Sequence, residues 1–301
     1  MTGPIAVTGA TGFLGGHICD ALLEQGLDVR AVVRDPNKGA HLTALHIPMA
    51  TADLADADAL LIGLKGCSAL VANAALGSWA GPIDRYMAVN VHGTARLLRA
   101  AAQAGVPRVV LISTVAVYRT RLNSWMDENA ALHGPKRRYF LASNLTTDWR
   151  YALSKSLAEA QAWDLARELG LQLTVLRPGP IFGPRDPKLT QRYGRLMGQR
   201  RCLVPTVGVP QLAALDCARA VPGALATPQS IGRAYNLAGP PTTMVDVLRT
   251  LTALTGAGPQ LVPVPVPLWV GYRTDRARDE LGFISRPLDE TLAEVVAAGL
   301  G

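Results

Sequence analysis

A tyrosine and a lysine four residues apart, with a threonine upstream, are the residues in this sequence best suited to acid–base chemistry. Tyr151 and Lys155 belong to the run Tyr-Ala-Leu-Ser-Lys at the start of a predicted helix, and Thr114 ends a predicted strand. Residues at i and i+4 share one helix face, so the ammonium can lie beside the phenol. A phenol has a pKa of about 10, and a neighbouring cation favours its ionised form. Tyr151 is therefore predicted to donate or accept a proton, while Thr114 bonds the same substrate oxygen.

A glycine-rich turn near the N-terminus predicts a site for a phosphorylated ligand. The apolar run at 4–8 leads directly into Gly9-Ala-Thr-Gly12-Phe-Leu-Gly15, which is followed by an amphipathic helical pattern. Glycine permits a tight turn, lets backbone N–H groups approach a pyrophosphate, and allows a helix to pack closely on a strand. The helix N-terminus adds the positive end of its dipole. An ordinary strand-to-helix turn is the alternative, but the strand before and the helix after favour a dinucleotide.

The end of the second predicted strand distinguishes between two dinucleotides. A carboxylate there bonds the ribose 2′-hydroxyl of NAD, whereas a cation accommodates the 2′-phosphate of NADP. The strand ends at Val33, which is followed by Arg34 and, four residues later, by Lys38. Both cations also fit an ordinary solvated surface, and Asp35 partly offsets their charge. The pattern favours NADP (NADPH) as the cofactor, with NAD less favoured.

Composition and charge narrow the class of protein. The chain has 301 residues, of which 49% are hydrophobic and 18% charged, as is typical of a soluble globular enzyme. The net charge of +7 comes from dispersed cations without a basic helix, so we expect no nucleic-acid partner. Four separated cysteines give no metal-ligand spacing, and no apolar stretch is long enough for a membrane span. The expectation is a cytoplasmic protein that holds no metal and acts on a small-molecule substrate.

Short apolar runs alternate with longer helical patterns through the first part of the chain. The apolar runs lie at 4–10, 28–34, 68–75, 108–114 and 171–179. This alternation predicts an α/β fold over residues 1–179, a doubly wound parallel sheet of the Rossmann type with crossover helices. Prolines interrupt the pattern after Gly179. We therefore expect a small C-terminal substrate-binding domain over 180–301, with some of its segments returning to the sheet domain.

Taken together, these motifs resemble those of an extended short-chain dehydrogenase/reductase of the NAD(P)-dependent epimerase/dehydratase superfamily. Within it, the pattern is most similar to reductases of the dihydroflavonol-reductase and hydroxysteroid-dehydrogenase type. The resemblance covers essentially the whole chain and is carried by TGATGFLG at 8–15, ADL at 52–54, NAA at 73–75, NVHGT at 90–94, STVAVY at 113–118, YALSK at 151–155, RPGPIFGP at 177–184 and YNLAG at 235–239. Chance agreement over so many segments is remote.

The resemblance assigns roles to individual residues. It makes Thr114, Tyr151 and Lys155 the catalytic residues, with Asn90 supporting a proton-relay water near the lysine. A side chain that only bonds backbone at a helix start is the alternative for Asn90. The motifs and the resemblance together give these cofactor-binding residues: Gly9, Thr11, Gly12, Phe13, Leu14, Gly15, Arg34, Lys38, Asp53, Leu54, Asn73, Ala74, Ala75, Tyr151, Lys155 and Pro178. Many relatives pair through helices of the sheet domain, so a homodimer is a candidate assembly.

Departures from the family pattern narrow the chemistry. The dehydratase branch places acidic residues directly after the catalytic serine or threonine, where this chain has Val115 and Ala116. Elimination of water needs such an acid and base, so a dehydratase is disfavoured. Pro180 and Val209 stand where nucleotide-sugar epimerases hold the diphosphate with asparagine and arginine. Four nearby arginines offer substitutes for these anchors: Arg192, Arg195, Arg200 and Arg201.

A long interval separates Thr114 from Tyr151 and is rich in aromatic and basic residues. It contains Trp125, His133, Lys136, Arg137, Arg138, Tyr139 and Phe140. Such a loop either shapes substrate access beside the tyrosine or forms a surface excursion without contact. If it lines the site, its aromatic residues, with the apolar tract near Trp269, would suit a relatively apolar carbonyl compound.

The sequence therefore predicts an NADP(H)-dependent oxidoreductase that interconverts a carbonyl and a secondary alcohol. Hydride passes between the nicotinamide and the carbonyl carbon, with Tyr151 as general acid or base. An NAD(P)-dependent nucleotide-sugar epimerase is the alternative activity. A redox-sensing protein that binds the nucleotide without catalysis is an alternative of another class, which the intact trio Thr114, Tyr151 and Lys155 disfavours.

Overall fold

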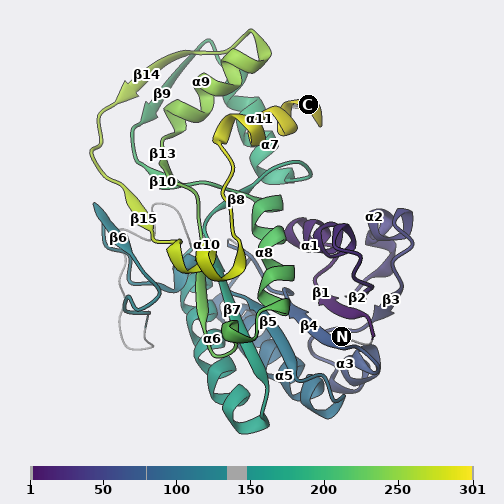
Figure 1. Ribbon diagram of the computed structural model, residues 1–301. Coiled ribbons are helices and arrows are strands. Elements are labelled where there is room, and N and C mark those ends of the chain that lie inside the picture. Colours follow the sequence, from purple (N-terminus) through teal and green to yellow (C-terminus); the bar gives the residue numbers. More distant parts are fainter. Residues whose placement is uncertain (1–2, 79, 134–147, 300–301) are drawn as a thin grey trace.

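A seven-stranded parallel sheet forms the centre of the molecule, in the order β12-β7-β5-β4-β1-β2-β3 (Figure 1). The computed structural model describes residues 3–78, 80–133 and 148–299. The strands of the sheet are β1 (Ile5–Thr8), β2 (Val29–Val33), β3 (Met49–Thr51), β4 (Ala69–Ala72), β5 (Arg108–Ile112), β7 (Gln172–Pro178) and β12 (Ala234–Leu237). Central strands are buried along nearly their whole length because helices cover both faces, which is why they read as continuous apolar runs. The predicted doubly wound α/β fold is confirmed.

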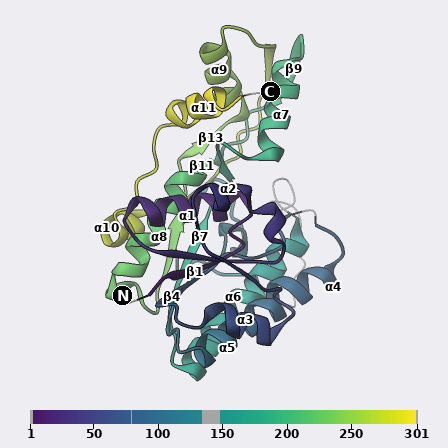
Figure 2. The ribbon, with the colours of Figure 1, turned by 90° about the vertical axis from the view of Figure 1, so that its right-hand side faces the viewer.

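Two different groups of helices cover the two faces of the sheet (Figure 2). One face carries α1 (Phe13–Glu24) and α8 (Ala214–Ala226), and the other carries α3 (Ala57–Leu64), α5 (Thr94–Gln103) and α6 (Trp149–Leu169). Alternate residues of a strand point to opposite faces. In β1, Val7 accordingly packs into the cluster with Ile18 and Val221, whereas Ala6 packs into the cluster with Leu60.

A smaller lobe extends beyond the carboxyl ends of the central strands, at the top of Figure 1. It contains α7 (Pro187–Met197), α9 (Met244–Thr255), α11 (Leu288–Ala297), β9 (Arg201–Pro205) and β14 (Gln260–Val264). Tyr193, Leu248 and Leu292 are fully buried in its core. Strand β12 and helix α8 come from beyond residue 180 yet belong to the sheet domain. That the rest of 180–301 binds substrate stays a prediction.

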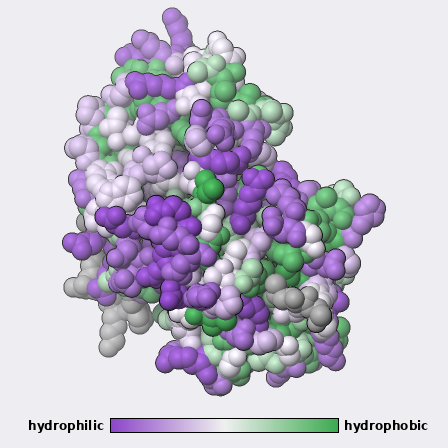
Figure 3. Space-filling view, in the orientation of Figure 1, coloured by the Kyte–Doolittle hydropathy of each residue, from purple (hydrophilic) through white to green (hydrophobic). Residues whose placement is uncertain are grey.

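Shorter elements complete the fold. They are α2 (Ala40–Ala44), α4 (Ile83–Tyr86), α10 (Asp275–Leu281), β6 (Ser124–Met126), β8 (Ile181–Phe182), β10 (Val209–Pro210), β11 (Leu212–Ala213), β13 (Pro241–Thr242), β15 (Val270–Tyr272) and a π-helical turn at Met87–Gly93. The face seen in Figure 3 is largely hydrophilic, with hydrophobic residues in small groups. Among the helices of the described ranges, none has the length and apolar character required to span a membrane.

The turn from β1 into α1 brings the helix backbone close to the end of the strand. Gly9 has a φ of +66°, a left-handed conformation that a side chain would strain. A Cβ on Gly15 would lie 2.1 Å from the Gly9 carbonyl oxygen and 2.8 Å from the Ala10 Cα. Both neighbours are backbone atoms, so neither can move aside cheaply. The first turn of α1 can therefore rest directly against the strand end only because Gly15 has no side chain.

Replacing Gly15 with alanine tests this contact. We expect Gly15→Ala to lower the free energy of unfolding by about 1–3 kcal/mol, because the added methyl group must displace backbone. Urea unfolding at neutral pH measures the change. Gly198→Ala is the matched control, since its Cβ would have its nearest neighbour at 3.5 Å, and it should stay within about 0.5 kcal/mol of the parent chain. Equal stability of the two variants would contradict the packing argument.

Candidate functional site

A cleft of about 500 Å³ runs across the carboxyl ends of the central strands, from the glycine turn to Lys155. Open α/β sheets bind their ligands at this edge. These predicted site residues line it: Gly9, Thr11, Gly12, Phe13, Leu14, Arg34, Lys38, Asp53, Leu54, Asn73, Ala74, Ala75, Thr114, Tyr151, Lys155 and Pro178. Two predicted residues lie outside the lining. Gly15 packs beneath the turn, and Asn90 is buried behind the cleft wall.

The glycine turn leaves the backbone N–H groups at the start of α1 without a side-chain cap. Gly12 is the N-cap of α1 and has no side chain to cap the first-turn N–H groups. The first turn also holds no acidic residue. Thr8 fixes the opposite wall, because its hydroxyl oxygen accepts hydrogen bonds from the N–H groups of Asn73 (3.0 Å) and Ala74 (3.1 Å). A helix N-terminus left open in this way suits a pyrophosphate, so the residues present fit a dinucleotide.

Two cations and two carboxylates surround the far end of the cleft, where β2 ends. Arg34 has a 70% exposed side chain, and its Nε lies 4.0 Å from an oxygen of Asp53. Lys38 lies in the short 3-10 turn at Pro36–Lys38. Asp35, which also lines the cleft, caps that turn by accepting from the Asn37 N–H at 3.1 Å. The carboxylate of Asp35 is thereby partly engaged by backbone, while Arg34 reaches into solvent.

A second cavity of about 360 Å³ adjoins the outer side of the glycine turn. It shares Thr11, Gly12, Phe13 and Lys38 with the cleft and adds His41 and Arg185. Arg185 has an unusual φ of +72° and donates to Asp20 at 2.6 Å, which ties the loop after β8 to α1. His41 lies 2.7 Å from the same carboxylate group. The positive charge of this cavity is therefore partly balanced by Asp20.

Tyr151 and Thr114 meet at the other end of the cleft. Asp148 caps the N-terminus of α6 and Tyr151 lies in the first turn, where its phenol hydrogen-bonds the Thr114 side chain. Burial raises the pKa of Tyr151 to about 12, the Thr114 bond opposes this rise, and the nearby Tyr86 adds to it. The rings of Tyr86 and Tyr151 are 6.4 Å apart, edge to face. The phenol therefore carries its proton at neutral pH in this structure.

Lys155 is buried one turn further along α6. Its residue is only 6% exposed, and its Nζ donates a hydrogen bond of 2.7 Å to the Ile112 carbonyl. Burial lowers the pKa of Lys155 to about 8, and the carboxylate of Glu159 opposes that decrease. Burial and the Thr114 hydrogen bond thus have the largest effects on the pKa of Tyr151. The i and i+4 spacing predicted that the lysine would lower this pKa, whereas the pKa is raised. Both side chains nevertheless line the same end of the cleft.

Asn90 holds the cleft wall from behind. It lies in the π-helical turn Met87–Gly93, a distortion often found at functional sites. Its Oδ1 accepts from the Leu76 N–H at 2.8 Å, and its Nδ2 donates to the Leu76 carbonyl at 3.2 Å and to the Ser154 hydroxyl at 2.9 Å. The amide thus ties the loop after β4 to α6. These contacts favour the backbone-bonding interpretation for its side chain, and a relay water stays a prediction.

Sequence reasoning missed much of the apolar lining. The residues it missed are Thr8, Val32, Val33, Asp35, Ala52, Leu60, Leu76, Gly77, Val89, Ile112, Ser113, Gly179 and Ile181. Most lie beside a predicted residue, so their position at a strand end was the available signal. Trp125 is half exposed and packs against Trp269, with ring centroids 5.6 Å apart, and neither lines the cleft.

The access loop and the four arginines are the remaining predictions about the site. Residues 136–140 lie outside the described part of the chain. The arginines occupy α7, β9 and the turn between them, and the lining of the cleft includes no side chain of Arg192, Arg195, Arg200 or Arg201 within the described ranges. Over those same ranges, no group of three or more His, Cys, Asp and Glu side chains could hold a metal ion.

Comparison with known proteins identifies the family. The model of the NAD dependent epimerase/dehydratase family matches residues 5–238. The chain belongs to that family. This epimerase/dehydratase-family chain is 31% identical over 277 residues to 2-alkyl-3-oxoalkanoate reductase from Shewanella oneidensis, covering 86% of this chain and 68% of the relative. The resemblance to extended short-chain dehydrogenases/reductases is therefore confirmed.

Solved structures extend the likeness of this epimerase/dehydratase-family chain to nearly its full length. A short-chain dehydrogenase/reductase superfamily protein from Agrobacterium tumefaciens, solved with bound NAD, has a TM-score of 0.79 and 25% identity, covering 98% of this chain and 96% of its own. UDP-glucose 4-epimerase from Thermotoga maritima has a TM-score of 0.81 and 23% identity, covering 98% of each chain. At that identity the epimerase shares the fold, and its activity does not carry over.

The buried ammonium of Lys155 predicts a dependence of stability on pH. Its pKa is about 8 in the folded chain against an ordinary value of 10.5, so between these values the unfolded chain binds more protons. Stability of the parent chain relative to Lys155→Met should therefore rise from pH 8 to pH 10.5, by at most about 3 kcal/mol. Urea unfolding of both proteins at several pH values measures this difference. A difference that stays constant over that window would show that Lys155 is not desolvated.

Proposed function

We propose that this protein is an NADP(H)-dependent oxidoreductase that interconverts a carbonyl and a secondary alcohol. The observation that carries the proposal is the single cleft that joins the open glycine turn to Tyr151, Thr114 and Lys155. The glycine turn would hold the pyrophosphate, and Pro178 would border the nicotinamide. When bound, the reduced nicotinamide supplies a hydride for the carbonyl carbon.

The chain's own residues supply the proton and the orientation. Tyr151 carries its proton at neutral pH, so it can donate that proton to the carbonyl oxygen as the carbon receives the hydride. Thr114, already bonded to the phenol, fixes the direction from which the oxygen approaches. Lys155 places an ammonium at the same end of the cleft, where it stabilises the phenolate left after proton transfer. In the oxidising direction the same residues have the reverse roles, and Tyr151 accepts the proton of the alcohol.

The preference for the phosphorylated dinucleotide rests on charge at the end of β2. Arg34 and Lys38 both line the cleft, and Arg185, partly balanced by Asp20, adds a further cation beside the glycine turn. Two carboxylates lie beside these cations: Asp35 accepts a hydrogen bond from the Asn37 N–H, and an oxygen of Asp53 lies 4.0 Å from the Arg34 Nε. Solvent-exposed cations bind a phosphate monoester without a large desolvation cost, which supports NADP over NAD.

A reductase is supported better than an epimerase. Three relatives that reach 30% identity over most of both chains carry the names of reductases, among them 2-alkyl-3-oxoalkanoate reductase, which suggests a 3-oxo acid as the first carbonyl to assay. The epimerase structures are similar in fold, so interconversion of a nucleotide sugar remains the alternative. Conversion of UDP-glucose without net change in the dinucleotide would favour that alternative.

Removing the phenolic hydroxyl should abolish turnover without disturbing nucleotide binding. We expect Tyr151→Phe to reduce kcat by about 10²–10⁴-fold, because the proton donor is lost. NADPH consumption with a 2-alkyl-3-oxoalkanoate measures kcat, and fluorescence titration measures the NADPH Kd, which should change little. Tyr193→Phe is the matched control, since that hydroxyl has no partner among the described residues and lies in the core of the smaller lobe. Normal turnover of Tyr151→Phe would remove the tyrosine from its role.

Neutralising the cations at the end of β2 should affect one dinucleotide selectively. We expect Arg34→Gln/Lys38→Gln to weaken NADPH binding by at least about tenfold, because two charge-assisted bonds to the 2′-phosphate are lost. NADH lacks that phosphate, so its Kd should change by less than about twofold. Titration of both dinucleotides with the parent chain and the variant measures the ratio. Equal losses for NADPH and NADH would show that these cations do not select the phosphate.

A further inference from the structure

A stripe of three polar side chains on α6 contacts three consecutive residues at the end of β5. Tyr151 bonds the Thr114 side chain, and Lys155 donates to the Ile112 carbonyl at 2.7 Å. One turn further, Glu159 accepts a hydrogen bond of 2.6 Å from the Ser113 hydroxyl. Residues at i, i+4 and i+8 share a helix face, so the helix is fixed to the strand end at three points. The first two points belong to the proposed chemistry, and the third has no role in it.

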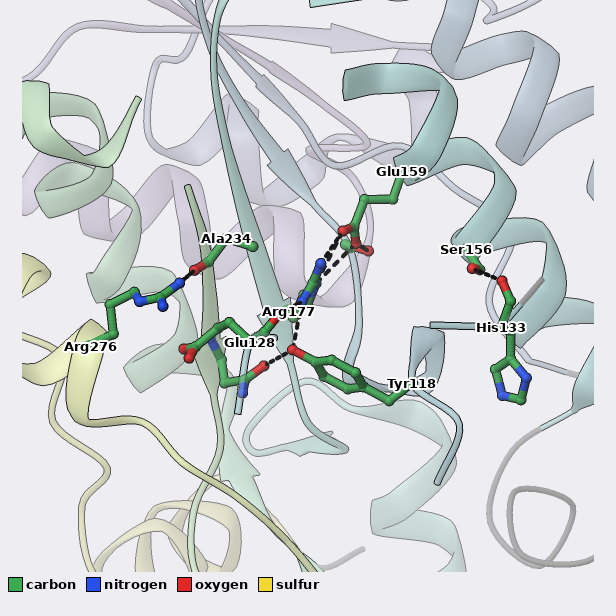
Figure 4. Close-up of polar contacts among 10 residues, drawn as sticks. Tyr118, Glu128, His133, Ser156, Glu159, Arg177, Ala234 and Arg276 are labelled. Carbon is green, nitrogen blue, oxygen red and sulfur yellow. Dashed lines mark hydrogen bonds and ion pairs between the residues drawn. The ribbon is translucent and has the colours of Figure 1, made fainter. Parts of the chain in front are cut away.

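Glu159 is held from the opposite side by a buried arginine. It has no exposed surface, and Arg177 on β7 is only 4% exposed. The guanidinium donates hydrogen bonds to the carboxylate from Nη2 and from Nε. The Nε atom lies 3.1 and 3.2 Å from the two carboxylate oxygens. Figure 4 shows Arg177 between Glu159 and Tyr118. The geometry allows the carboxylate little freedom to rotate, because both of its oxygens are engaged.

The arginine is itself fixed by uncharged groups on other elements. Its Nη1 donates to the Tyr118 hydroxyl at 2.6 Å and to the Glu128 carbonyl at 3.1 Å. The Tyr118 hydroxyl in turn donates to Oδ1 of Asn236 on β12 at 2.7 Å. The network therefore joins β7 and β12 to α6 and to the end of β5. A single buried carboxylate at its head is paired with Arg177 and lies one turn along α6 from Lys155.

We propose that Glu159 is a positioning residue for the reaction, because it fixes the Ser113–Thr114 strand end against α6 and its charge offsets the burial of the Lys155 ammonium on the same helix face. The inference rests on the proposed function, since it assigns no chemistry to Glu159 itself. A buried ion pair is a weak source of net stability, so stability alone does not explain the presence of this pair. The site next to it, in contrast, requires a buried ammonium to stay charged.

The charges around the ammonium give the direction of the effect. The carboxylate of Glu159 raises the pKa of Lys155 against the lowering by burial. Arg177 neutralises part of that carboxylate from β7, and the phenols of Tyr151 and Tyr118 are uncharged at neutral pH. Removing the charge of Glu159 therefore makes Lys155 lose its proton at lower pH.

The principal test uses Glu159→Gln, which keeps the shape and one acceptor oxygen while removing the charge. We expect kcat for reduction of a 2-alkyl-3-oxoalkanoate at pH 8 to fall by about tenfold or more, and the pH at which activity declines to move to lower pH. The NADPH Kd at pH 6 should stay within about threefold of the parent value, because Lys155 is protonated in both proteins there. Glu168→Gln, an exposed change on the last turns of the same helix, is the control and should leave every value unchanged.

A purely structural role predicts a different result. Glu159→Gln would then lower the unfolding temperature while leaving kcat and the pH profile as in the parent chain, and that outcome overturns the proposal. Should Glu159→Gln fail to fold, Ser113→Ala carries the test, because it leaves the ion pair with Arg177 intact and removes the link to the strand end. Ser113 also lines the cleft, so the NADPH Kd at pH 6 must stay within about threefold of the parent value in this variant. A fall in kcat of about threefold or more at unchanged unfolding temperature supports the proposal, and an unchanged kcat overturns it.

Failure of the proposed function gives a separate signature. If the parent chain reduces no carbonyl, titration of NADPH from pH 6 to pH 10 still reports the charge of Lys155 through the Kd. Weakening of NADPH binding at lower pH in Glu159→Gln than in the parent supports the inference without any turnover. Identical pH dependence of the Kd in the two proteins contradicts it, whatever reaction the enzyme catalyses.

Discussion

The contact between Gly15 and the Gly9 carbonyl is the constraint on which the cleft depends. A helix can begin directly at the end of a parallel strand only if its first turn passes close to the strand backbone, and here one added Cβ would lie 2.1 Å from a carbonyl oxygen. This close passage aims the open N-terminus of α1 across the ends of the neighbouring strands. Because Thr8 then ties Asn73 and Ala74 to β1, the phosphate end of the cleft is fixed on both walls. The chemical end can lie opposite only because β5 and β7 end at the same edge of the sheet.

The fold and the position of the site could be predicted from the sequence because both follow from local patterns. Apolar runs alternating with helical patterns specify a parallel sheet, and parallel strands bring their carboxyl ends to one edge. Residues placed at those ends, such as Asn73, Thr114 and Pro178, therefore had to meet around one cleft. The spacing of Tyr151 and Lys155 also put both on one face of α6. None of these inferences needed knowledge of the tertiary packing.

What the sequence could not supply is the partner of each buried group. The i and i+4 spacing placed an ammonium near a phenol, but it did not indicate that the Ile112 carbonyl would take the Lys155 hydrogen bond. Asn90 reaches Leu76 and Ser154 through a π-helical turn, which changes the helical phase in a way that no periodicity reveals. Glu159, at i+8 from Tyr151, was visible in the sequence as a continuation of the stripe. Its significance depends on Arg177, which is 18 positions away in the chain.

The cations at the two ends of the cleft differ in their exposure to solvent. Arg34 is 70% exposed, so its field is weakened by solvent and salt, and the contribution we propose for it is to recognise a charged ligand rather than to hold the fold. Lys155 is 6% exposed, where the same unit charge interacts strongly with each neighbour and is costly to leave uncompensated. An exposed cation can select the cofactor without support from other residues. A buried cation such as Lys155 needs the opposite charge of Glu159, and the buried Glu159 in turn needs Arg177. The groups that support a charged lysine therefore extend from α6 through Arg177 on β7 and Tyr118 to Asn236 on the outermost strand of the sheet.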